Sequence, residues 1–214
     1  EFIARLEEEG ELVRIKEEVS PILEITEITD RVSKSQMGGK ALLFENVKDH
    51  SMPVLINAFG SAKRMCLALG VNDIEKIASE IKQLIETKPP QSFSEKLGLI
   101  PTLLDLTRVP SKKFKGATAP CQEVILTGDD IDLNKLPVLK CWPQDGGRFI
   151  TLPVVFTQSP INGKRNVGLY RMHVYDKSTT GMHWHIHKDG AGHFQEHKKL
   201  NKRMEVAVAI GTDP

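Results

Sequence analysis

Residues 166 to 187 read NVGLYRMHVYDKSTTGMHWHIH, a stretch that brings together an amide, an arginine and a run of histidines. β-Branched and aromatic residues favour a strand over 167–175 and an extended segment again over 182–186. The segment between them, 176–181, is rich in turn-forming residues. The stretch therefore predicts a β-hairpin, and its polar side chains mark the first place to look for an active site.

Side chains alternate along a strand, so Asn166 and Arg171 are expected on opposite faces unless a bulge intervenes. His183, His185 and His187 are expected to share one face. Imidazoles in that arrangement could bind a transition metal, and the amide oxygen of Asn166 suits a harder ion such as magnesium or manganese. Arg171 has the planar fork of donors that fits a carboxylate or a phosphate. Half-exposed histidines and a surface ion pair are the alternatives that the residues alone leave open.

Length and composition restrict the class of protein. The chain has 214 residues, of which 40% are apolar, enough for a core in one large or two small domains. No apolar run approaches the roughly 18 to 20 residues that span a bilayer, and no leader-like pattern opens the chain, so a soluble, cytoplasmic protein is expected. The 29 basic residues nearly balance the 28 acidic ones, which argues against nucleic acid as a partner. Three widely spaced cysteines argue against a disulfide framework.

The first half of the sequence alternates between helical and strand patterns, which predicts an α/β domain over 1–108. Helices are expected over 2–9, 21–36, 61–69, 74–85 and 92–106, and strands over 12–15, 41–44 and 54–57. The polar residues of this half form no convergent set, so we expect a scaffold. The segment 109–120 is rich in proline, lysine and glycine and predicts a connector between domains.

The second half changes to short β-rich segments. Strands are expected over 123–127, 149–156, 167–175, 182–186 and 205–210. Strands at this density, with turns between them, favour a barrel or a sandwich. Gly190-Ala191-Gly192 invites comparison with a phosphate-binding loop, although it lacks the full Walker pattern and the dinucleotide fingerprint.

Three runs together resemble the UbiD family of prenylated-FMN-dependent decarboxylases: TLP at 151–153, NVGLYR at 166–171 and HWHIHKDG at 183–190. The similarity extends over nearly the whole chain, from FIARLEEEGEL at 2–12 to VAVAIGTDP at 206–214. It implies a split β-barrel over 121–214, like that of flavin reductases, with the α/β domain docked beside it.

The resemblance also implies a reaction and a site. The reaction is the non-oxidative decarboxylation of an aromatic or α,β-unsaturated acid on prenylated FMN, for example a prenylated hydroxybenzoate of ubiquinone biosynthesis. Asn166 and His187 match two ligands of a divalent metal, usually Mn²⁺, and the Val167 backbone matches a K⁺ site. Arg171 matches the catalytic arginine that holds the substrate carboxylate over the flavin. The matched cofactor contacts are Thr151, Asn166, Leu169, Tyr170, Arg171, His183, Trp184, His185, His187 and Lys188.

By the same resemblance, the proton-donating glutamate and a third metal ligand lie beyond Pro214, so the chain is expected to be an inactive part of a longer, homo-oligomeric enzyme. Family sequences often carry an arginine and a hydrophobic residue in place of His183 and His185, so the flavin and substrate contacts there are expected to differ. The expected partners are the acid and the flavin prenyltransferase that makes the cofactor, with association at a membrane surface if the substrate is prenylated. Two alternatives stay open: a split-barrel oxidoreductase that uses unmodified FMN, and a non-catalytic module whose histidines hold zinc.

Overall fold

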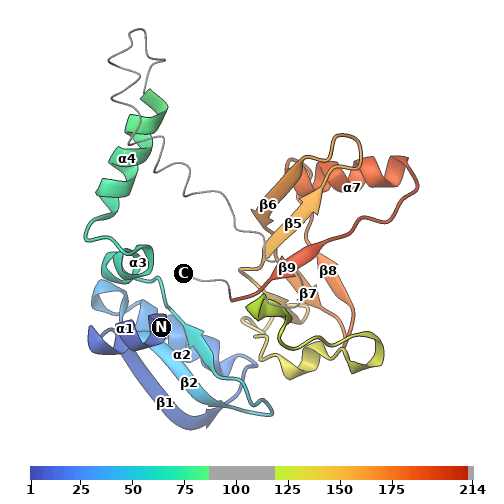
Figure 1. Cartoon of the computed structure of the whole chain (residues 1–214). Coiled ribbons are helices and arrows are strands. Elements are labelled where there is room, and N and C mark those ends of the chain that lie inside the picture. Colours follow the sequence, from blue (N-terminus) through green and yellow to red (C-terminus); the bar gives the residue numbers. More distant parts are fainter. Residues whose placement is uncertain (87–118, 212–214) are drawn as a thin grey trace. The chain divides into compact units, whose positions relative to one another are not determined.

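The computed structural model describes residues 1–86 and 119–211, and Figure 1 traces them in colour from blue to red. Packing of the Cα atoms groups Glu1–Asn72 with Ile131–Pro214 in one compact unit and Asp73–Asp130 in a second. Within the described ranges, no helix has both the length and the apolar character that crossing a membrane requires.

Two predictions concern residues 87–118, which the structure does not describe. The helix expected over 92–106 lies outside the described residues. The division into domains 1–108 and 121–214, with the connector at 109–120, stays a prediction for the same reason.

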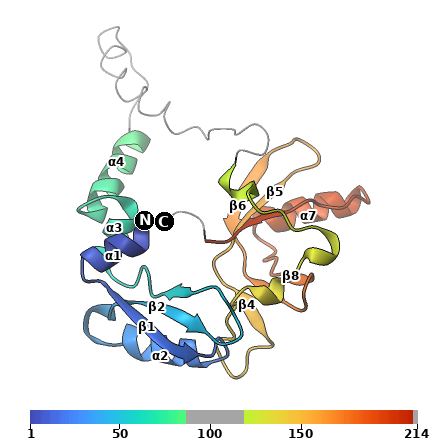
Figure 2. The same cartoon turned by 60° about the horizontal axis from the view of Figure 1, so that its bottom comes forward.

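The N-terminal part is a βαβ unit with one added strand. Its elements are α1 (Phe2–Glu8), β1 (Leu12–Val19), α2 (Glu24–Ser33), β2 (Ala41–Val47) and β3 (Val54–Ile56). β1 and β2 run parallel, with Val13 opposite Leu42, and β3 runs antiparallel to β2. Parallel neighbours need a crossover connection, which α2 supplies. Figure 2 shows α2 lying along one face of this sheet.

An apolar core joins α2 to the sheet. Ile25 and Phe44 are fully buried and pack with Val19, Leu42 and Val47. Removing such a side chain from water contributes about 1.5–3 kcal/mol to folding. The helix predicted over 21–36 and the strand predicted over 41–44 are confirmed, although α2 is shorter than expected and β2 is longer.

Two helices follow β3, namely α3 (Ala62–Leu69) and α4 (Ile74–Glu86). Ser61 caps α3, because its Oγ accepts a hydrogen bond from the Arg64 backbone N–H at 3.2 Å. Gly70 ends the helix with φ of 66°, a left-handed conformation that glycine adopts without strain. Both helices are confirmed within one residue of their predicted bounds.

Arg64 is a fully buried cation in this unit. Its Nη1 donates to Glu11 Oε2 at 2.9 Å and to the Gly39 carbonyl oxygen at 2.7 Å. Its Nε and Nη2 have no hydrogen-bond partner among the described residues. The guanidinium therefore connects α3 to the residue before β1 and to the turn before β2.

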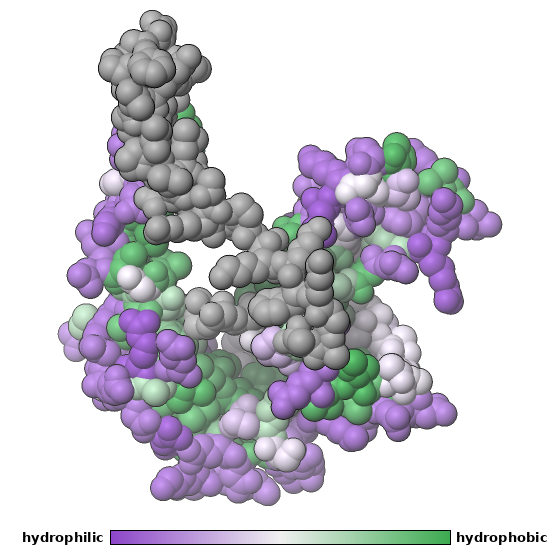
Figure 3. All heavy atoms as spheres, in the orientation of Figure 1, coloured by the Kyte–Doolittle hydropathy of each residue, from purple (hydrophilic) through white to green (hydrophobic). Residues whose placement is uncertain are grey.

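The C-terminal part contains two three-stranded antiparallel sheets, ordered β4-β7-β8 and β6-β5-β9. The elements are β4 (Arg148–Ile150), β5 (Val154–Gln158), β6 (Arg165–Leu169), β7 (Met172–Val174), β8 (Thr180–Met182), α7 (Asp189–Lys199) and β9 (Ala207–Ala209). Helix α7 lies beside β5 and β6 in Figure 1, and its outer surface is mostly hydrophilic in Figure 3. The fold is thus mixed α/β with small sheets.

Several predicted strands of this half need correction. The strand expected over 123–127 is absent, and a 3₁₀ turn at Pro120–Gln122 precedes irregular chain there. The strand expected over 149–156 is two strands, because the link 151–153 contains Pro153, which has no N–H for a ladder. The strand expected over 167–175 is also two strands, interrupted at Tyr170 and Arg171.

The segment after β8 was also predicted wrongly. The strand expected over 182–186 ends at Met182, and the glycine run 190–192 is the first turn of helix α7. Two glycines in one turn lower the intrinsic helix propensity, which is why the pattern concealed the helix. Asp189 in the first turn and three basic residues in the last turn complement the helix dipole.

We predict that Arg64→Met lowers the free energy of unfolding by about 2 kcal/mol, because a carboxylate and a carbonyl group lose a charged donor. Urea unfolding of both proteins measures the difference. Lys63→Met is the matched control: Lys63 is half exposed and bridges Glu9 and Glu11. Lys63→Met is expected to lower the free energy of unfolding by less than about 1 kcal/mol. An equal decrease in the free energy of unfolding for the two variants would show that the buried arginine stabilises the fold no more than an exposed lysine does.

Candidate functional site

Tyr170 and Arg171 connect β6 to β7, and therefore connect one sheet to the other. Tyr170 is only 4% exposed, whereas the Arg171 side chain is 49% exposed. Each of these two neighbours lines a different hollow. The hexapeptide singled out from the sequence thus contributes to two sites rather than one.

The first hollow, here called the Asn166 hollow, has a volume of about 300 Å³. It lies where β6 meets the start of α7, and it is lined by Asn166, Gly168, Tyr170, His187, Lys188 and Asp189. The structure therefore brings together Asn166 and His187, the two residues predicted to bind a divalent metal. An amide oxygen and an imidazole are a donor pair that suits Mn²⁺ or a similar ion.

One cation and one carboxylate line the Asn166 hollow, those of Lys188 and Asp189. Lys188 precedes α7, and its Nζ donates to the Leu169 carbonyl oxygen at 3.0 Å. At the start of α7, the Gly190 N–H donates to the Tyr170 hydroxyl and the Ala191 N–H to the Lys188 carbonyl oxygen, whereas the Asp189 N–H makes no hydrogen bond within the described ranges. Lys188 and that one N–H are the groups here that could complement a phosphate, and Asn166 with His187 could complement a divalent cation.

The second hollow, here called the Arg171 hollow, has a volume of about 320 Å³. It is lined by Phe149, Arg171, His173, Tyr175, Gly181, Met182 and His183. The Arg171 guanidinium carbon lies 3.7 Å from the centre of the Phe149 ring. Its Nη2 lies 3.5 Å from Asp145 Oδ1, a long contact that leaves most of its donors unused. The Arg171 guanidinium therefore lies over a ring while its fork remains able to bind an anion.

Phe149 belongs to a column of rings. Its ring stacks on His173 with centroids 4.4 Å apart, and His173 contacts Tyr175 at 4.5 Å. Phe149 and His173 are opposite one another in the β4–β7 ladder, so the register sets this contact. A side chain at Gly147 would collide with His173, and one at Gly181 would collide with Tyr175. The two glycines thus leave room for the column that supports Arg171.

Trp184 and Tyr170, predicted as cofactor contacts, pack against each other and against α7. Their ring centroids are 5.0 Å apart in an edge-to-face arrangement, and Trp184 also stacks on Phe194 at 6.5 Å. The Tyr170 hydroxyl oxygen accepts from the Gly190 backbone N–H at 2.9 Å. Tyr170 still lines the Asn166 hollow.

The three histidines predicted to share a face do not all gather. His183 lines the Arg171 hollow, whereas His187 lines the Asn166 hollow and contacts the exposed His185, with ring centroids 5.3 Å apart. The reason is that β8 ends at Met182, so the period-two alternation stops before the first of them. Across the residues that the structure describes, no group of three or more His, Cys, Asp and Glu could hold a metal ion.

Three other predicted residues, Thr151, Val167 and Leu169, line neither hollow, and Leu169 is half exposed at the end of β6. Thr151 is exposed in the link between β4 and β5. The Val167 side chain is 53% exposed, and Val167 is opposite Phe156 in the β5–β6 ladder. Since neighbouring side chains alternate, that of Val167 is on the opposite face of the strand from Asn166.

Buried polar contacts fix α7 on the sheet. His193 Nδ1 lies 2.9 Å from Thr157 Oγ1, and both side chains are buried. One turn further along, the Ser159 hydroxyl donates to Glu196 at 2.7 Å. Thr157 is opposite Asn166 in the β5–β6 ladder, so Asn166 faces the same side as the helix. These contacts determine where α7 starts beside Asn166.

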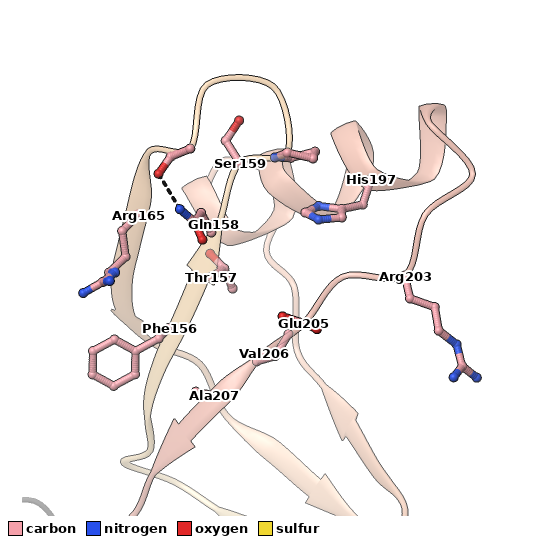
Figure 4. A pocket seen from close by; sticks show the side chains of 12 residues that line it. Phe156, Thr157, Gln158, Ser159, Arg165, His197, Arg203, Glu205, Val206 and Ala207 are labelled. Carbon is pink, nitrogen blue, oxygen red and sulfur yellow. Dashed lines mark hydrogen bonds between the residues drawn. The ribbon is translucent and has the colours of Figure 1, made fainter. Parts of the chain in front are cut away.

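A larger hollow, about 680 Å³, is elsewhere and contains none of the predicted site residues. Figure 4 shows it at the far end of β5, with His197 entering from α7 and the Arg203 side chain extending away. Its lining is Phe156, Thr157, Gln158, Ser159, Pro160, Gly163, Arg165, His197, Arg203, Glu205, Val206 and Ala207. Its cationic side chains diverge, so size alone does not make it the better candidate.

The turn between β7 and β8 holds one side of the Arg171 hollow in place. Asp176 Oδ1 accepts hydrogen bonds from the backbone N–H of Ser178 at 2.9 Å and of Thr179 at 2.7 Å. These bonds stabilise the ionised carboxylate and hold the pKa of Asp176 below its ordinary value.

Sequence reasoning missed the surroundings of Arg171. Phe149, His173 and Tyr175 were treated only as strand formers, and Asp145 was not considered. A signal existed for two of them: Arg171, His173 and Tyr175 follow one another at period two, as side chains on one face of a strand do. The contact with Phe149 depends on strand pairing, which the sequence does not reveal.

Known families match most of the chain. Residues 3–81 match the 3-octaprenyl-4-hydroxybenzoate carboxy-lyase N-terminal domain, UbiD_N. Residues 112–214 match the 3-octaprenyl-4-hydroxybenzoate carboxy-lyase Rift-related domain, UbiD.

Individual relatives agree with these matches. A protein of uncharacterised function from Aquifex aeolicus is 51% identical over 214 residues, which are 43% of its length. UbiD-class enzyme HmfF from Pelotomaculum thermopropionicum, in complex with FMN, has a similar structure, with a TM-score of 0.78 and 26% identity. Vanillic acid decarboxylase from Sedimentibacter hydroxybenzoicus superposes with a TM-score of 0.79 and 28% identity. The whole chain is covered in each comparison, but it spans only 42% of each of these two structures.

We predict that Asp176→Asn lowers the free energy of unfolding at pH 7, and that the difference between the variant and the unmutated protein becomes smaller in acid. Because the folded pKa is depressed, the stabilisation is complete above the ordinary value of 3.8 and is lost as the pH falls through the folded pKa. Urea unfolding at pH 7 and at pH 3 measures the effect. Asp129→Asn is the control, since the Asp129 carboxylate accepts no hydrogen bond in the described chain. The same difference at both pH values would refute the prediction.

Proposed function

Because this chain belongs to the UbiD family, we propose that it forms the cofactor-binding part of an enzyme that decarboxylates an aromatic or α,β-unsaturated carboxylic acid. The observation that carries the proposal is the placement of two adjacent residues: Tyr170 lines the Asn166 hollow, and Arg171 lies over the Phe149 ring in the Arg171 hollow. One stretch of chain would then contribute both to a site for a cation and a phosphate and to a site for a carboxylate.

We propose prenylated FMN as the cofactor. Asn166 and His187 would hold a divalent cation, most suitably Mn²⁺, and Lys188 with the start of α7 would hold the cofactor phosphate. The Val167 backbone is assigned to a K⁺ ion on the family resemblance alone. When bound, the cofactor supplies the electron sink that the departure of CO₂ from an sp² carbon requires.

Arg171 has the central role among the residues of this chain. A guanidinium fork donates two parallel hydrogen bonds to a carboxylate, which fixes the orientation of the acid as well as its position. The ring under Arg171 and the contact with Asp145 restrict the guanidinium before an acid arrives. Less conformational entropy is then lost on binding.

The remaining assignments complete the proposal. We propose that the two small sheets belong to a split β-barrel and that the protein assembles with copies of itself. A flavin prenyltransferase would supply the cofactor. A prenylated hydroxybenzoate of ubiquinone biosynthesis is one candidate substrate, and it would bring the protein to a membrane surface.

The proposal is tested by the mass and the absorption spectrum of the flavin that co-purifies with the complete protein, expressed together with a flavin prenyltransferase and Mn²⁺. We expect a bound flavin heavier than FMN by one prenyl unit. Plain FMN that is reduced by a nicotinamide cofactor would instead support an oxidoreductase. Zinc without any flavin would support the metal-binding module.

We predict that substitutions in the two hollows have separable effects. Asn166→Ala and His187→Ala are each expected to lower the amount of flavin retained after gel filtration, because each removes a metal ligand. Arg171→Ala is expected to retain the flavin and to lose decarboxylation. Flavin absorbance and CO₂ release are the two measurements, and decarboxylation at the unmutated rate by the Arg171 variant would contradict the assignment.

The ring below Arg171 leads to a separate prediction. Phe149→Leu removes the cation–π contact, and we expect kcat/KM to fall about fivefold, since such contacts contribute about 1 kcal/mol. Phe149→Tyr keeps an aromatic face and is expected to behave like the unmutated protein. Equal rates for the leucine and tyrosine variants would show that the ring does not position Arg171.

A further inference from the structure

Tyr170 is a tyrosine whose hydroxyl group lies inside the protein, between β6 and the start of α7. The residue is 4% exposed. Its hydroxyl oxygen accepts hydrogen bonds from two different elements: from the Gly190 backbone N–H at 2.9 Å and from Asn166 Nδ2 at 3.1 Å. One oxygen atom therefore joins the first turn of α7 to the amide of Asn166.

These two bonds determine how the Asn166 amide is used. Its Nδ2 is directed to Tyr170, and its Oδ1 accepts no hydrogen bond within the described ranges. The oxygen is the atom that can bind a cation, and it is the one left available at the Asn166 hollow. In the flipped amide, Tyr170 would donate its proton to Oδ1, and Nδ2, which cannot bind a cation, would be left at the hollow.

Two glycines make room for the ring. A Cβ at Gly168 would lie 2.9 Å from Tyr170 Cε2. A Cβ at Gly190 would lie 2.7 Å from the Tyr170 hydroxyl oxygen and 2.6 Å from Trp184 Cζ3. At each glycine a side chain would collide with the ring of Tyr170. The backbones of β6 and α7 can therefore approach the ring this closely only because neither residue has a Cβ.

The ring is fixed on its other sides as well. Trp184 contacts it edge to face, and Lys188 Nζ lies 5.0 Å from its centroid. Lys188 in turn donates to the Leu169 carbonyl oxygen, immediately before Tyr170 in the chain. The hydroxyl group consequently has little freedom to leave its two donors.

We infer that Tyr170 is a positioning residue for the divalent cation: its hydroxyl orients the Asn166 amide and sets the start of α7, and therefore His187, at a fixed place beside it. The inference rests on the proposed function, because the cation is the one assigned there. Residues that orient metal ligands typically change metal affinity by about 10- to 100-fold when they are removed. Tyr170 contributes this orientation without touching the ion.

The test is the affinity of the complete protein for Mn²⁺ alone, measured from the electron paramagnetic resonance signal of the free ion. Tyr170→Phe removes one oxygen atom and keeps the ring, and we expect the dissociation constant to rise about tenfold. Tyr175→Phe is the matched control, since its hydroxyl makes no hydrogen bond in the described chain. Melting temperature and circular dichroism of each variant check that the fold is kept.

A double variant separates positioning from a general structural role. Because Tyr170 acts in part through the amide, Tyr170→Phe is expected to weaken Mn²⁺ binding less once Asn166→Ala has removed that amide. Unchanged affinity in Tyr170→Phe, or full additivity in the double variant, overturns the inference and leaves the proposed function standing. An unmutated protein that binds no Mn²⁺ overturns the metal assignment and this inference together.

Discussion

The passage of the chain from one sheet to the other at Tyr170 and Arg171 is the constraint on which the site depends. β6 ends at Leu169 and β7 begins at Met172, so two residues accomplish the change of sheet. Within those two residues the side chain direction reverses, as along any strand. Tyr170 is consequently buried under α7, while Arg171 emerges over Phe149 on the neighbouring sheet. Neither hollow could form if the strand continued unbroken.

Helix α7 depends on that passage and also stabilises it. The helix is held to β5 by the buried pair of Thr157 and His193 and to the β5–β6 hairpin by Ser159 and Glu196. In its first turn, the Gly190 N–H donates a hydrogen bond to the Tyr170 hydroxyl oxygen. A buried polar pair stabilises little unless its partners are satisfied, and then it specifies one arrangement over others. The position of the helix start, and not merely its presence, is therefore determined by polar contacts.

Much of the N-terminal fold was predictable because its patterns are local. The helical spacing of Ile25, Ile28 and Val32 and the apolar run of β2 are visible in the sequence itself, and both elements form, with α2 shorter and β2 longer than expected. The C-terminal half was predicted less well. Its strands are three to five residues long, which is too short for an alternating pattern of apolar and polar residues to be recognised. The strands predicted over 149–156 and 167–175 are interrupted where the chain passes from one sheet to the other. Helix α7 was not predicted because its first turn contains two glycines, one of which, Gly190, makes room for the ring of Tyr170.

Two residues of the candidate site were predicted to lie together, whereas most of the geometry around them was not predicted. Asn166 and His187 were matched to the family from the sequence, and the structure brings them to one hollow. The ring column below Arg171 requires knowledge of which strands pair, which no spacing supplies. Asp145 adds a further consequence. Arg171 already has an acidic neighbour, so an arriving acid joins a cation and anion pair that is close to electrical neutrality, and bare charge attracts it only weakly. Selectivity in this hollow then falls to its aromatic walls, which favour a flat organic acid over chloride, sulfate or any other ion without a ring.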